Sequence, residues 1–187
     1  SVEVSYDGAA SVTVAYAPTL AWNPTGPADG QVHSLWLKFI DGAGNRSPAY
    51  FASTTYDLAA PVVASITDDG NYSPWIDKLH VSWIATDAVS GVVQQFVRVG
   101  TAPGFDDIAS DRDVGMVASY TFLGLSLDTS GVTNYYFTIR VIDAVGRVSA
   151  SVSSDGIKGG DPTPPLPITI TDDGAYTAST TMLHATW

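Results

Sequence analysis

The sequence predicts an all-β protein built of tandem two-layer sandwiches, and three observations carry this prediction. Hydrophobic and polar residues alternate with period two along most of the chain, which is typical of strands that bury one face. Clusters of Gly, Pro, Asp and Asn separate these segments at intervals that suit short strand connections. Ser and Thr make up about a fifth of the chain whereas charged residues make up 14%, a balance that favours sheet surfaces.

The expected strands follow one another along the whole chain. Residues 1–6 and 12–16 alternate first, and 35–40 follows after a turn-rich stretch. Further along, 79–83 and 135–142 alternate in the same way, so each is expected to bury one face. The turn clusters lie at 7–8, 24–30, 41–45, 69–70, 103–104 and 130–131. The side chains predicted to face a core include Trp22, Leu35, Leu37, Phe39, Trp83, Tyr135, Phe137, Ile139, Val141 and Trp187.

Charge and composition exclude several classes of function. The chain carries 8 Lys and Arg against 19 Asp and Glu, and its net charge of −11 would repel a phosphate backbone. It has no Cys, which excludes disulfides and thiol chemistry. No apolar stretch approaches the ~18 residues of a transmembrane helix. We therefore expect no nucleic-acid partner and no membrane insertion.

An internal repeat sets the expected domain organisation. Residues 66–72 recur as 170–176, and 79–83 recur as 183–187, each displaced by 104 positions. Two matched blocks with an unchanged gap indicate a repeating unit of about a hundred residues. The expected domains are the C-terminal part of a sandwich at 1–60, a complete sandwich at 61–158, a Pro/Gly linker at 159–165 and the first two strands of a further sandwich at 166–187.

Residues 61–158 resemble a fibronectin type III domain of the kind found in tandem in bacterial exported proteins. Leu-x-Val-x-Trp at 79–83 is similar to its second strand with the core tryptophan, and the alternation at 135–141 is similar to its sixth strand. Gly-Leu-x-Leu at 124–127 resembles the segment that precedes the tyrosine corner of that family.

Residues 1–60 resemble the later part of a related bacterial Ig-like repeat, through Trp22 and the segment 35–45. One departure is His33, which stands at the position of Tyr135 and leaves the first unit without the tyrosine of that corner. The resemblance implies structural repeat modules, serving as spacers, stalks or adhesive modules in an extracellular or cell-surface protein. Fold membership does not decide among these roles.

The sequence predicts no catalytic residue, no cofactor and no metal ligand. Phosphate loops and nucleophile motifs are absent, and the carboxylate pairs at 106–107 and 111–113 are interpreted as solvated loop residues. The Asp-Asp-Gly segments at 68–70 and 172–174 carry oxygen ligands that suit calcium, but a turn explains them as well. The same holds for the hairpin around Asp41 and Asn45, and we expect no rise of the melting temperature with calcium.

Two surfaces are candidates for interaction. Alternation sends Trp36 and Ile40 to the face opposite the core, where an aromatic beside Ile40 favours binding of a glycan or a protein unless a neighbouring loop covers Trp36. At the other end of the chain, two unaccompanied strands would leave Leu183, Ala185 and Trp187 in water. We expect residues 166–187 to pack against 1–60 of a neighbouring copy, which would give a head-to-tail filament, unless the sequence is an arbitrary cut through a longer repeat protein.

Overall fold

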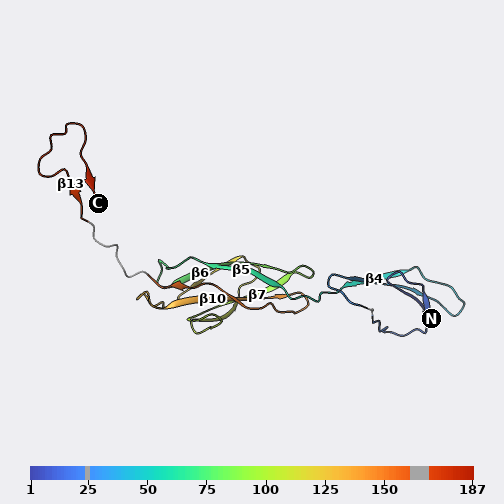
Figure 1. Ribbon diagram of the computed structural model, residues 1–187. Coiled ribbons are helices and arrows are strands. Elements are labelled where there is room, and N and C mark those ends of the chain that lie inside the picture. The colour runs from blue at the N-terminus through green and yellow to red at the C-terminus, as the bar shows by residue number, and fades with distance from the viewer. Residues whose placement is uncertain (24–25, 161–168) are drawn as a thin grey trace.

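The computed structural model describes residues 1–23, 26–160 and 169–187, and every regular element in these ranges is a β-strand. A helix capable of crossing a bilayer is absent from the described residues. Figure 1 shows a first sheet, a central two-layer sandwich and a separate C-terminal hairpin in succession. The all-β prediction is confirmed.

The first sheet has four antiparallel strands in the order β2-β1-β3-β4. Val2 and Val4 are its best-buried apolar side chains, at 6% and 0% exposure. The register pairs Val4 with Leu37, and β3 pairs on its other side with β4. The strands are β1 (Val2–Tyr6), β2 (Val12–Val14), β3 (Val32–Phe39) and β4 (Tyr50–Thr55).

The central sandwich consists of two layers (Figure 1). One layer has the strand order β5-β6-β9, and the other has β11-β10-β7-β8 with β12 also paired to β10. The strands of the first layer are β5 (Val62–Asp68), β6 (Lys78–Thr86) and β9 (Ser119–Leu123). Those of the second are β7 (Val92–Gly100), β8 (Ala109–Asp113), β10 (Asn134–Asp143), β11 (Val152–Ser153) and β12 (Ile157–Lys158).

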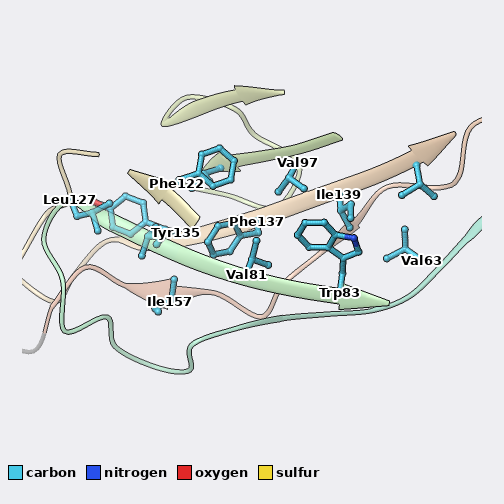
Figure 2. Close-up of a cluster of buried hydrophobic side chains, with 13 residues drawn as sticks. Val63, Val81, Trp83, Val97, Phe122, Leu127, Tyr135, Phe137, Ile139 and Ile157 are labelled. Atoms are coloured by element: carbon cyan, nitrogen blue, oxygen red, sulfur yellow. The ribbon is translucent and has the colours of Figure 1, made fainter. Parts of the chain in front are cut away.

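The core of the central sandwich follows the period-two pattern of the sequence. Phe137 and Ile139 of β10 are fully buried, as is Val81 of β6, and Trp83 is only 5% exposed. Figure 2 shows these side chains filling the space between the layers. Burying a large apolar side chain contributes about 1.5–3 kcal/mol, so this alternation stabilises the sandwich. The predicted core faces of both strands are confirmed.

A tyrosine corner closes one end of this sandwich. The hydroxyl of Tyr135 accepts a hydrogen bond from the backbone N–H of Asp128 at 2.6 Å, and the Tyr135 side chain is 2% exposed. In the first sheet, the buried His33 stands at the equivalent position. Its Nδ1 lies 2.8 Å from Oδ2 of Asp7, so an imidazole–carboxylate pair replaces the corner there.

The core face of the first sheet is less buried than the sequence predicts. Phe39 is 41% exposed, and Leu35 and Leu37 are half-buried. The alternation is correct, but no second layer of strands covers this face among the described residues. A groove of about 310 Å³ remains, lined by Val2, Val14, Ala15, Tyr16, Ala17, Pro18, Thr19, Leu20, Leu35, Leu37 and Phe39.

The C-terminal hairpin consists of β13 (Thr171–Asp172) and β14 (Ala185–Thr186), which pair with each other. Leu183 and Trp187 are 74% and 83% exposed. The prediction that Trp187 is a core residue is therefore wrong within a single chain, because two strands alone provide no opposing layer. Most of the predicted linker at 159–165 lies outside the described residues.

Candidate functional site

The face of the first sheet that carries Trp36 is the first candidate site. Trp36 is 45% exposed, and its ring packs against Phe51 of the neighbouring strand at a centroid distance of 4.6 Å. Ile40 is half-buried just beyond the end of β3. The structure thus places Trp36 at the surface, supported by a second aromatic ring instead of being covered by a loop.

A shallow depression of about 220 Å³ adjoins Trp36. Glu3 and Lys38 line it, and they are direct partners in the β1–β3 register. Glu3 also accepts a hydrogen bond from Arg46 at 2.8 Å. An aromatic face beside charged and hydroxyl-bearing side chains has the chemistry needed to hold a sugar ring or a polar peptide.

The groove on the opposite face of the first sheet is the second candidate site. Apart from Tyr16 and Thr19, the residues that line it have apolar side chains, and it lies where a sandwich would place its other layer. The candidates Leu183, Ala185 and Trp187 are exposed on the C-terminal hairpin and do not fill the groove of their own chain. The two apolar surfaces remain separate within one chain.

Three of the turn aspartates that were considered as calcium ligands, Asp41, Asp69 and Asp173, already have local partners. Both oxygens of Asp41 accept hydrogen bonds, Oδ1 from the N–H of Ala43 and Oδ2 from the Asn45 amide. That amide contact, followed by the Asn45 N–H, holds the pKa of Asp41 below its ordinary value. Asp69 pairs with His80 at 2.9 Å, and its repeat counterpart Asp173 lies 3.5 Å from His184.

Three of the four carboxylates considered for catalysis, those of Asp107, Asp111 and Asp113, are also held by neighbours. Asp111 lies 3.0 Å from Arg140, and the Thr101 hydroxyl lowers the pKa of Asp107 by donating a 2.7 Å hydrogen bond. The Gln94 amide lowers the pKa of Asp113 in the same way. A carboxyl with a lowered pKa is ionised at neutral pH and is a poor general acid. These groups support strands and loops.

A cluster that the sequence did not indicate lies where the first sheet joins the central sandwich. Asp57 follows β4, Asp87 follows β6, and Asp143 ends β10. One carboxylate oxygen of each lies within 4.8 Å of the other two. Residues so far apart in sequence are brought together only by the junction of the two units, so no local motif could have revealed them.

Comparison with known proteins supports the fold alone. No protein-family model and no curated protein matches the chain. Among solved structures, domains A168–A170 of titin match with a TM-score of 0.50 and 13% identity, over 86% of this chain and 55% of that one. The FN1–FN3 domains of chicken CNTN1 match with a TM-score of 0.40 and 16% identity, over 84% and 56%. The central fibronectin-III array of RIM-binding protein matches with a TM-score of 0.32 and 19% identity, over 100% and 66%.

The titin match is the one of the three that bears on the fold. It places this chain in the class of tandem fibronectin type III and Ig-like β-sandwiches, with several antiparallel sheets. The chain spans between about half and two thirds of the chains it matches.

Proposed function

We propose that this chain is a non-enzymatic spacer within an extracellular or cell-surface repeat protein, exported from a bacterium as the sequence resemblance implies. The supporting observation is the direct connection between the first sheet and the central sandwich. The guanidinium Nε of Arg147 donates a hydrogen bond to the backbone oxygen of Asp57 at 3.1 Å. A Cβ placed on Gly30 would lie 3.9 Å from the Val89 side chain, so the two units also approach each other closely at this point.

Such a junction limits the freedom of one unit relative to the next. Units that are connected in this way extend a chain and keep whatever it carries away from the surface. The acidic surface suits this role, since a net charge of −11 opposes non-specific aggregation of a crowded array.

The second, more specific part of the proposal is that copies of this chain assemble head to tail. The 79–83 block of β6 places Leu79 and Trp83 against the β7–β10 layer, and its copy carries Leu183 and Trp187 at the same positions. The groove of the first sheet corresponds to the surface that Leu79 and Trp83 cover in the central sandwich. Leu35 in this groove occupies the repeat position that Phe137 occupies in β10. The C-terminal hairpin of a second copy would supply strands of the missing layer over the first sheet.

Sedimentation equilibrium tests the assembly. We expect the weight-average mass of the chain to rise with concentration, and the substitution Leu183→Asp to abolish that rise. Leu123→Asp is the matched control, because Leu123 of β9 is 73% exposed and lies outside both surfaces. A wild-type chain that stays monomeric at every concentration, or a Leu183→Asp chain that assembles normally, contradicts this part of the proposal.

A second candidate function is adhesion through Trp36, which the exposed Trp36–Phe51 pair favours. Glycan-array and protein-array binding of Trp36→Ala, compared with wild type, tests it. Trp75→Ala is the control, because Trp75 is 50% exposed on the central sandwich, where Lys78 lies over its ring. Loss of a signal in Trp36→Ala alone supports adhesion, and equal signals in all three proteins contradict it.

A further inference from the structure

Two of the three junction aspartates, Asp57 and Asp143, are buried and have carboxylate oxygens that lack a hydrogen-bond partner. Asp57 is 7% exposed, and neither of its carboxylate oxygens has a partner among the described residues. Asp143 is 1% exposed, and within the same part of the chain its Oδ2 also lacks a partner. Burying an ionised group in this way costs several kcal/mol unless an opposite charge compensates it.

The remaining oxygens of the cluster are fixed by the backbone. Oδ1 of Asp143 accepts hydrogen bonds from the N–H groups of Val145 and Arg147, at 2.9 and 2.8 Å. Oδ1 of Asp87 accepts three, from Val89, Ser90 and Gly91. Burial would raise the pKa of Asp87, but these three N–H donors outweigh it and lower the pKa. The Asp87 and Asp143 carboxylates are thus each oriented through one oxygen and have the other available.

Comparison of the two copies of the internal repeat explains why Oδ2 of Asp143 lacks a hydrogen-bond donor. Its counterpart Asp41 begins the same hairpin 102 positions earlier, and there the Asn45 side chain satisfies Oδ2. Arg147 replaces Asn45 in the second copy, and its Nε donates instead to the backbone oxygen of Asp57. The substitution that ties the two units together therefore also leaves Asp143 Oδ2 without a donor.

The charges of the cluster do not balance. Asp57, Asp87 and Asp143 contribute three negative charges, and Arg147 contributes one positive charge beside them. Two negative charges are left over in a site where two of the three side chains are almost fully buried. One divalent cation would neutralise them.

We propose that Asp57, Asp87 and Asp143 bind one calcium ion at the junction of the two units. Calcium takes six to eight oxygen ligands at about 2.3–2.6 Å, so oxygens up to roughly 5 Å apart can share it. The three carboxylate oxygens of this cluster lie within 4.8 Å of one another, which suits such an ion. The proposal revises two sequence predictions, that the chain has no metal ligand and that its melting temperature does not rise with calcium.

An ion at this position would join the units, because Asp57 belongs to the first and the other two ligands belong to the second. Asp57 supplies two unpartnered oxygens, and Asp87 and Asp143 supply one each. Water would complete the coordination shell at the partly exposed Asp87 side.

Calorimetric titration and thermal unfolding of the whole chain test the site. After treatment with a chelator, we expect calcium chloride alone to titrate to one ion per chain, with a Kd on the order of 10⁻⁴ to 10⁻³ M. At 10 mM calcium, we expect the melting temperature to rise by roughly 5–10 °C, because the ion binds the folded state alone.

The substitution Asp57→Asn shows whether Asp57 is a calcium ligand or has only a structural role. It removes a charge but no hydrogen bond of the side chain, so in chelator we expect the variant to melt at or above the wild-type temperature. In calcium, it should lose the one-site titration and the thermal rise. Asp69→Asn is the control, because Asp69 belongs to the Asp-Asp-Gly turn and pairs with His80.

Two results would overturn the proposal. One is a wild-type chain that shows neither heat of binding nor a thermal rise in calcium. The other is a rise that Asp57→Asn retains in full or that Asp69→Asn abolishes, since either outcome places the ion elsewhere.

Discussion

The hydroxyl of Tyr135 accepts the backbone N–H of Asp128 at 2.6 Å and so ties the loop before β10 to the core. Tyr135→Phe keeps the ring but leaves a partly buried N–H without an acceptor. We expect it to lower the free energy of unfolding by about 1–3 kcal/mol, measured by urea denaturation. Tyr72→Phe, on an exposed side chain, should change it by less than about 0.5 kcal/mol. Equal effects of the two substitutions would contradict this role of Tyr135.

The same loop makes the stability of the central sandwich depend on pH. The side-chain hydrogen bond from Thr133, followed by the N–H and hydroxyl of Ser130, lowers the pKa of Asp128 from 3.8 to about 2. A lowered folded-state pKa means that the stabilisation is complete above about pH 4 and is lost as the pH falls toward 2. We expect Asp128→Asn to flatten the loss of stability in this window. A variant with the wild-type pH profile would contradict the assignment.

The repeat allows one substitution to be compared in two environments. Leu79 is 2% exposed and its copy Leu183 is 74% exposed. Leu79→Ala should cost about 2–5 kcal/mol in the unfolding of the central sandwich, because it leaves a cavity. Leu183→Ala should change that transition by less than about 0.5 kcal/mol. Chemical denaturation followed by Trp fluorescence measures both, and a large effect of Leu183→Ala would show that the hairpin packs on its own chain.

Gly100 has no room for a side chain. A Cβ there would lie 2.5 Å from the backbone carbonyl of Phe105, which cannot move aside easily. Gly100→Ala should therefore destabilise the sandwich by about 1–3 kcal/mol. Gly42→Ala meets nothing within 4 Å and should be tolerated. Comparison of the two melting curves with wild type measures the difference, and a neutral Gly100→Ala would contradict the close approach of the loop.

Local patterns of the sequence predicted the strands and the faces of the central sandwich. Alternation places Phe137 and Ile139 in the core because the period of a strand is two and both layers of this sandwich are present. The same reasoning predicted a buried Trp187, which is exposed in the structure. Alternation shows which face of a strand is apolar, but it does not show whether a second layer covers that face. The sequence did not predict the junction cluster, because Asp57 and Asp143 are far apart in the chain and come together only through tertiary structure.

Mechanical unfolding of the single chain tests most directly the claim that this protein is a spacer of independently folded sandwich units. With the chain held at both ends, the account predicts one discrete unfolding event for the sandwich predicted at 61–158. That event should lengthen the chain by roughly 300 Å, because extended residues span about 3.3–3.6 Å each. A smooth extension without this event, or an event of clearly different length, would contradict the account.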